Sequence, residues 1–98
     1  MENEILQYMD AIIYSYKRAF SNEVMLQGFF ESCRLDEGSK YIKVVCNNSV
    51  HSFIVKEDGP MFNRGDILKA ASWRAPALNF ARGNVLTGDF KDISWTGA

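Results

Sequence analysis

Apolar residues recur at helical spacing over the first twenty positions of the chain. In the segment ENEILQYMDAIIYSYKRAF they are Ile5, Leu6, Met9, Ile12, Ile13, Tyr16 and Phe20. This series follows the i, i+3, i+4, i+7 spacing of an amphipathic helix, and its acidic first turn and basic last turn suit the helix dipole. We expect one long helix ending at Ser21. Its apolar stripe packs on a sheet, which we favour, or on a second copy of the helix.

Residues 24–35 fit two patterns. The spacing of Leu26, Phe29 and Cys33 fits a helix, whereas the alternation of side chains after Gly28 fits a strand. Glycine is disfavoured inside a helix, and a turn sequence, DEGS, follows directly. We favour a strand for this segment and keep the helix as the alternative.

The middle of the chain carries the pattern of an antiparallel meander. YIKVVC (41–46) and VHSFIVKE (50–57) are rich in β-branched and aromatic residues, and the turn sequence NNS (47–49) joins them. The turn sequence EDGP (57–60) then leads to a shorter strand, DILKA (66–70). One face of this meander is apolar enough to pack against the N-terminal helix.

Start and stop signals predict a further short helix later in the chain. Pro76 suits the first turn of a helix and Gly83 suits its exit, so residues 74–82 are expected to form about two helical turns. A Thr-Gly-Asp turn follows, and residues 93–96 have a β-like aromatic pattern. The expected fold is therefore α+β, a single domain spanning residues 1–98. A long N-terminal amphipathic helix packs on an antiparallel sheet of about four or five strands, with a short second helix near 74–82.

Composition narrows the class of protein. The 98 residues are 47% hydrophobic and 13% aromatic, which is typical of a folded protein with one core. The net charge of -1 gives no general attraction to DNA or to anionic membranes. No apolar run approaches the roughly 20 residues of a membrane span, and no leader-like segment opens the chain. We expect a soluble intracellular protein that does not associate with membranes.

Few residues suit catalysis or metal binding. Two cysteines, Cys33 and Cys46, and one histidine, His51, are too few for an ordinary zinc site. A Cys46–His51 nucleophile pair lacks a third, orienting group, and the acidic residues are scattered. We therefore predict no catalytic residue, no metal site, no cofactor and no enzymatic activity. The cysteines are expected to be reduced thiols, a bridge being the alternative in an exported protein. The tripeptide RGD at 64–66 is expected to be a turn.

The segment KAASWRAPALNFARGN combines cations, an aromatic ring and amides. Its candidate residues for binding a nucleic acid or another ligand are Lys69, Trp73, Arg74, Asn79, Arg82 and Asn84. Arginine and lysine pair with phosphate, tryptophan stacks on a base, and asparagine bonds a base edge. The alternative, which we favour, is that Trp73 packs under the sheet and the arginines are solvated.

The same segment resembles part of a family of small, mostly uncharacterised proteins of tailed bacteriophages. The family pattern is SVH.F followed by GD.LKAASW.APA...ARGN. The chain keeps Ser49, Val50, His51, Phe53, Gly65, Asp66, Leu68 to Trp73, Ala75 to Ala77 and Ala81 to Asn84. It departs from the pattern at Leu78-Asn79-Phe80, where the family is more polar and often basic. The resemblance covers about the second half of the chain and implies a phage accessory protein acting in the host bacterial cytoplasm, with no activity attached.

Two functions follow as expectations. The first is a small non-enzymatic accessory protein that binds a host or phage protein or assembles with itself, most simply as a homodimer, since short strands leave open sheet edges. The second is a nucleic-acid or nucleotide-binding protein that uses the segment 69–84. The two differ in salt dependence, because binding through phosphate weakens steeply as salt rises.

Overall fold

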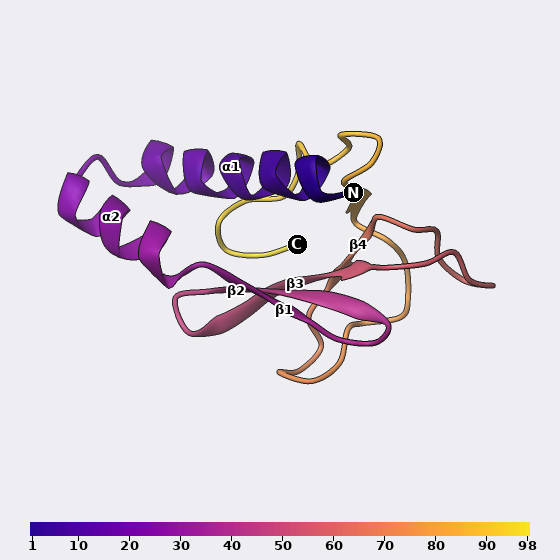
Figure 1. Cartoon of the computed structure of the whole chain (residues 1–98). Coiled ribbons are helices and arrows are strands. Elements are labelled where there is room, and N and C mark those ends of the chain that lie inside the picture. The colour runs from indigo at the N-terminus through magenta and orange to yellow at the C-terminus, as the bar shows by residue number, and fades with distance from the viewer.

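The N-terminal stripe forms helix α1, Glu2–Ala19, which lies across one face of a five-stranded sheet in the computed structural model of the protein (Figure 1). The structure describes all 98 residues. The buried positions of α1 are Ile5, Tyr8, Ile12 and Tyr16. They follow the predicted helical spacing, so the long helix and its packing on a sheet are confirmed.

The sheet is an antiparallel meander in which each strand pairs with the next along the chain. Its strands are β1 Arg34–Glu37, β2 Tyr41–Cys46, β3 Ser49–Val55, β4 Asp66–Lys69 and β5 Gly83–Asn84. Asn47 and Asn48, with φ of 54° and 60°, form the two-residue turn between β2 and β3. The α+β fold and the number of strands agree with the prediction.

Both faces of the sheet are covered. On the inner face, which we define as the face toward α1, Val44, Ile54 and Ile67 join the buried residues of the helix in the main core. On the opposite, outer face, Phe53 and Leu68 belong to a smaller buried cluster. The chain after β4 curls beneath this outer face (Figure 1). Most residues of β2, β3 and β4 are therefore buried on one face or the other, whereas those of the edge strand β1 are exposed.

The strand prediction for residues 24–32 is wrong, because this segment is helix α2, Glu23–Ser32. The Asn22 side chain caps it by accepting hydrogen bonds from the backbone N–H groups of Val24, at 2.9 Å, and Met25, at 3.2 Å. Gly28 lies inside this helix, and no neighbouring atom lies within 4 Å of the place a side chain would take, so packing does not require glycine there. Only the end of the predicted strand is correct, since β1 begins at Arg34.

The predicted helix at 74–82 is also wrong, and the second helix of the fold is α2. The backbone of this segment pairs with β4 instead: the N–H of Ala77 donates to the carbonyl of Lys69 at 2.8 Å, and Ala70 and Pro76 form an isolated bridge. The N–H of Arg82 donates to the carbonyl of Ile67 at 2.7 Å. Hydrogen bonds to β4 therefore replace those of a helix, and Pro76 tolerates this position because it has no N–H to satisfy.

The C-terminal segment passes between α1 and the sheet (Figure 1). The N–H of Trp95 donates to the Ser15 hydroxyl at 3.1 Å, and the Trp95 ring packs edge-on against Tyr16. The predicted Thr-Gly-Asp turn is present, with Gly88 at φ 72°. The β-like piece at 93–96 is reduced to one bridge, between Ser94 and Gly97.

None of the helices is long and apolar enough to cross a membrane.

Candidate functional site

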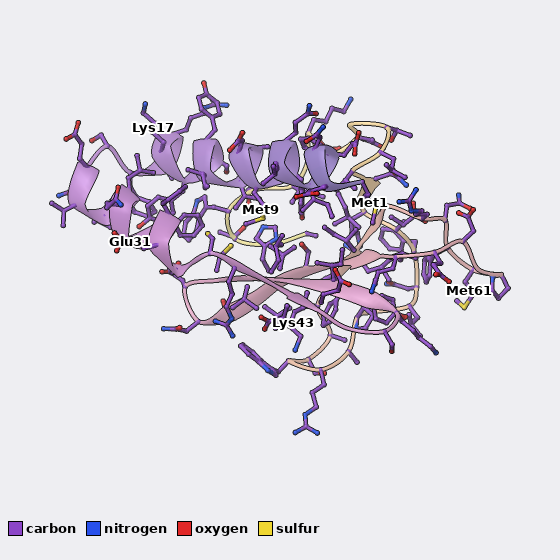
Figure 2. All side chains as sticks on the ribbon, in the orientation of Figure 1. Met1, Met9, Lys17, Glu31, Lys43 and Met61 are labelled. Atoms are coloured by element: carbon purple, nitrogen blue, oxygen red, sulfur yellow. The ribbon has the colours of Figure 1, made fainter.

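A cationic and aromatic hollow lies on the outer face of the sheet. The Lys43 ammonium lies 4.9 Å from the centre of the Trp73 ring, a distance suited to a cation–π contact. Lys43 and Arg74 line a hollow of about 470 Å³ together with Lys40 and Tyr41, and the Trp73 ring, which is 47% exposed, lies beside it. Figure 2 shows Lys43 pointing away from α1 on this side of the sheet.

A tight turn presents Trp73 and Arg74. The N–H groups of Ala71 and Ser72 both donate to the carbonyl of Ala75, at 3.0 and 3.1 Å. The Ser72 hydroxyl accepts from the N–H groups of Arg74 and Ala75. These bonds use the backbone groups of the turn internally, which leaves the side chains at its tip exposed.

The hollow carries uncompensated positive charge. Its two carboxylates belong to Asp36 and Glu37, and each is already paired, with Arg34 at 3.3 Å and with Lys56 at 3.0 Å. The cations of the hollow that make no salt bridge are Lys40, Lys43 and Arg74. An anionic group is the complement of such a surface.

An apolar hollow of about 360 Å³ adjoins the cationic one. Its apolar lining comes from Tyr41, Val55, Pro60, Met61, Phe62 and Leu78. Met61 is 65% exposed and Leu78 is 50% exposed. Met61 lies on the loop that projects beyond the strands (Figure 2). Because both hollows share Ser39, Lys40 and Tyr41, we treat them as one feature, the outer groove, with an apolar part and a basic part.

The residues predicted from the segment 69–84 do not form one site. Arg74 lines the basic part of the outer groove with Lys43, and Trp73 lies beside it, in contact with Lys43. Lys69 pairs across the strands with Ser52, whose hydroxyl bonds α1, so alternation places Lys69 on the inner side. The Trp73 ring is exposed, which differs from the favoured expectation that it packs under the sheet.

Arg82 lies outside the groove. Its guanidinium stacks 4.0 Å from the centre of the Phe80 ring, and its Nε is buried without a hydrogen-bond partner. It lines neither part of the outer groove.

The side chains of Asn79 and Asn84 form hydrogen bonds with neighbouring parts of the chain. The Asn84 amide donates to the Arg64 carbonyl and the Asp66 carboxylate, while its oxygen accepts from the N–H groups of Leu86 and Thr87. The Asn79 oxygen accepts from the N–H of Phe80 at 3.0 Å. Asn84 therefore has no free group for a base edge.

The RGD tripeptide is a structural turn, as predicted. Gly65 is buried with φ 89°, which favours glycine, and the Asp66 carboxylate accepts from the Asn63 N–H at 2.8 Å. The Arg64 N–H donates to Asp58 at 2.7 Å.

A chain of buried polar groups links α1, β3 and the C-terminal segment, and no sequence motif indicates it. A bulge in β3 sets Val50 and Ser52 opposite consecutive residues of β2, so His51 is the extra residue. The Ser52 hydroxyl lies 2.7 Å from the Tyr8 hydroxyl and 2.9 Å from His51 Nδ1, and His51 Nε2 lies 2.6 Å from the Ser94 carbonyl oxygen.

One assignment of donors and acceptors accounts for all three of these hydrogen bonds. The Tyr8 hydroxyl donates to Ser52, the Ser52 hydroxyl donates to Nδ1 of neutral His51, and Nε2–H donates to the Ser94 carbonyl. Burial lowers the pKa of His51 and raises the pKa of Tyr8. Tyr8 and Ser52 are fully buried, so this Ser–His pair is out of reach of a substrate and holds the fold together.

The two cysteines lie in contact, with their sulfur atoms 3.1 Å apart, and both are free thiols. Both ring nitrogens of His51 are already bonded, to Ser52 and to Ser94. The Cys46–His51 nucleophile pair is therefore not formed. The structure also contains no group of three or more His, Cys, Asp or Glu side chains placed to hold a metal ion.

Fold and surface define a small α+β protein with one amphipathic groove on the outer face of its sheet. The chain belongs to a family of unknown function, DUF7717, which it matches over residues 1–98. The match covers the whole chain, whereas the resemblance expected from the sequence covers only about the second half. No curated protein and no solved structure matches the chain.

Proposed function

We propose that this protein is a non-enzymatic accessory protein that binds another protein through the outer groove. The observation that carries the proposal is the junction of an apolar hollow with a basic one at Ser39, Lys40 and Tyr41. A partner segment that pairs an apolar side chain with an acidic one complements both parts at once.

Each part of the groove offers a defined contact. An apolar side chain of the partner is buried between Met61 and Leu78, removing the most exposed apolar surface of the groove from water. A carboxylate two or three residues along is bound by Lys43 and by the fork-shaped guanidinium of Arg74. Trp73 and Arg74 are of the residue types that dominate binding energy at protein interfaces.

The resemblance to tailed-bacteriophage proteins supports a phage origin for this chain. The partner is then a host or phage protein, and the place of action is the host bacterial cytoplasm.

Self-assembly is the alternative form of protein binding, and it uses a surface other than the outer groove. Helix α2 exposes Val24 and Phe30, and the edge strand β1 exposes Leu35 beside it in the chain. Exposed apolar side chains next to an unpaired strand edge favour a twofold homodimer. In sedimentation equilibrium, Phe30→Glu then lowers the dimer fraction, whereas Leu78→Ser leaves it unchanged.

Nucleic-acid or nucleotide binding is a second candidate, and the exposed Trp73 ring beside Lys43 and Arg74 favours it. A base stacks on the indole while the cations pair with phosphate. This mode uses the basic part of the groove and leaves Met61 and Leu78 without a role.

Fluorescence anisotropy separates these candidates. The probes are a labelled peptide of alternating glutamate and leucine, its counterpart with lysine in place of glutamate, and labelled oligothymidylate. Protein binding predicts that the acidic peptide binds and the basic one does not, and that Leu78→Ser and Arg74→Ala each weaken binding about tenfold. Lys69→Ala is the control, because Lys69 lies outside the groove.

Nucleic-acid binding predicts a different outcome. Oligothymidylate binds, Trp73→Ala and Arg74→Ala weaken it, Leu78→Ser does not, and affinity falls steeply as salt rises. Absence of binding by all three probes, with the protein folded, contradicts both uses of the groove.

A further inference from the structure

Cys33 and Cys46 occupy facing positions at the end of a strand pair. The register of β1 and β2 places Arg34 opposite Val45, so the next residues in line are Cys33 and Cys46. Facing residues of antiparallel strands have Cα atoms about 4.5 to 5.5 Å apart, which lies inside the range that a disulfide spans. Their sulfur atoms lie 3.1 Å apart, so bonding them needs little movement of the backbone.

The two thiols differ in access to solvent. Cys33 is half-buried, whereas Cys46 is only 3% exposed and belongs to the main core. An external reagent therefore reaches the Cys33 sulfur and not that of Cys46.

The pKa values of the two thiols also differ, and the difference favours reaction at Cys33, the more accessible thiol. The hydrogen bond with Cys46 lowers the pKa of Cys33, and the hydrogen bond with Cys33, together with burial, raises the pKa of Cys46. The accessible sulfur is thus the better thiolate, and once Cys33 is ionised the buried Cys46 thiol keeps its proton and donates to it.

We propose that Cys33 and Cys46 are a redox modification site that forms a reversible disulfide, with Cys33 as the reacting thiol and Cys46 as the resolving thiol. The co-reactant is a low-molecular-weight disulfide, RSSR. The site is separate from the outer groove, because neither cysteine lines it and both pack in or against the main core on the other face of the sheet.

The exchange proceeds in two balanced steps. The Cys33 thiolate attacks one sulfur of RSSR, forming the mixed disulfide Cys33–S–SR and releasing RS⁻. The Cys46 thiol then loses its proton to solvent and attacks the Cys33 sulfur, which forms the Cys33–Cys46 bond and releases a second RS⁻. The two protein thiols are oxidised by two electrons, and RSSR is reduced to two thiols. Excess thiol reverses both steps.

The bond ties two elements together. Cys33 is the residue that ends α2, and Cys46 is the last residue of β2. The disulfide therefore holds the C-terminal end of α2 against the sheet. The groove on the other face of the sheet remains open, so oxidised and reduced protein bind the same groove ligand.

The test incubates the folded, full-length protein in mixtures of oxidised and reduced glutathione, traps free thiols with N-ethylmaleimide, and measures intact mass. The expected product is a monomer that takes up no N-ethylmaleimide, carries no glutathione and recovers both thiols after dithiothreitol. Cys46→Ser is expected to accumulate one glutathione adduct on Cys33, and Cys33→Ser is expected to react far more slowly with oxidised glutathione.

Three outcomes overturn the proposal: two glutathione adducts on the wild-type protein, a disulfide-linked dimer as the main product, or two alkylated thiols under conditions that oxidise the glutathione pool. The wild-type result alone decides, so the proposal stays testable even where a serine variant folds poorly. If the disulfide forms normally but no groove ligand binds, the proposed function fails and the redox site stands. If the groove ligand binds but no disulfide forms, the redox site fails and the proposed function stands.

Discussion

Nε2 of His51 lies 2.6 Å from the carbonyl oxygen of Ser94, and this contact joins the bulge of β3 to the C-terminal segment. Through Ser52 the same histidine is connected to Tyr8 on α1. Three parts of the chain that lie far apart in sequence are thus held by one buried, neutral imidazole.

Stability is expected to fall as the pH drops below the ordinary His pKa of 6.5. Burial lowers the pKa of His51 in the folded state, so the unfolded chain binds the proton more tightly and acid favours unfolding. The stabilisation is complete above pH 6.5 and is lost as the pH falls towards the lower folded pKa. Urea unfolding across this range measures the effect.

His51→Gln is the matched control for this pH dependence, because His51 is the single histidine of the chain. The variant is less stable than wild type at neutral pH, and its stability changes little between pH 7 and pH 5.5. An equal slope in wild type and variant would show that another group titrates.

Removing the Tyr8 hydroxyl is expected to cost about 1 to 2 kcal/mol of unfolding free energy. Tyr8→Phe leaves the buried Ser52 hydroxyl without its donor at 2.7 Å. Tyr14→Phe is the comparison, since Tyr14 lies exposed on the same helix and its loss is expected to stay within about 0.5 kcal/mol. Chemical denaturation gives both values, and equal losses would contradict the polar chain.

Helix α2 is expected to depend on one aromatic residue. Phe29 is buried and stacks on Tyr16 with ring centres 4.1 Å apart, so Phe29→Ala costs about 3 to 5 kcal/mol. Phe30, which is 55% exposed, is expected to change stability by less than about 0.5 kcal/mol when replaced by Ala. If the segment were a strand with the opposite face buried, the order of the two losses would reverse.

The sequence was sufficient for α1 and the meander but not for α2. Regular spacing along a long helix and alternation between clear turns are strong signals, and both elements follow them. In α2 only Phe29 is buried, so the short segment has little periodicity, and Gly28 weighed against it. Asn22 was the signal available, because asparagine is among the best helix N-caps.

The helix predicted at 74–82 is wrong because the local start and stop signals are outweighed by backbone pairing with a strand distant in sequence. Pro76 and Gly83 suit a helix start and stop, but the N–H groups of Ala77 and Arg82 find acceptors on β4, which no local pattern reveals. The candidate site failed in part for the same reason. The sequence places Arg74 and Arg82 in one candidate segment, whereas in the structure Arg74 lines the groove with Lys43 of β2.

Replacement by alanine is expected to lower the stability of the protein at Gly83 and to raise it at Gly28. A side chain at Gly83 meets the backbone carbonyl oxygen of Asp89, so Gly83→Ala destabilises the β5 region. Gly28 faces open space inside a helix, so Gly28→Ala is expected to stabilise by about 0.5 to 1 kcal/mol. Thermal unfolding of the two variants beside wild type measures both, and stabilisation by Gly83→Ala would contradict the close approach.

The most direct test of the outer groove is a chemical-shift map of the isotope-labelled protein titrated with the alternating glutamate–leucine peptide. The groove predicts shifts at Tyr41, Lys43, Leu78 and the Trp73 indole, with α1 unchanged. Shifts confined to α2 and β1, or no shifts at a peptide excess, would contradict binding at the groove.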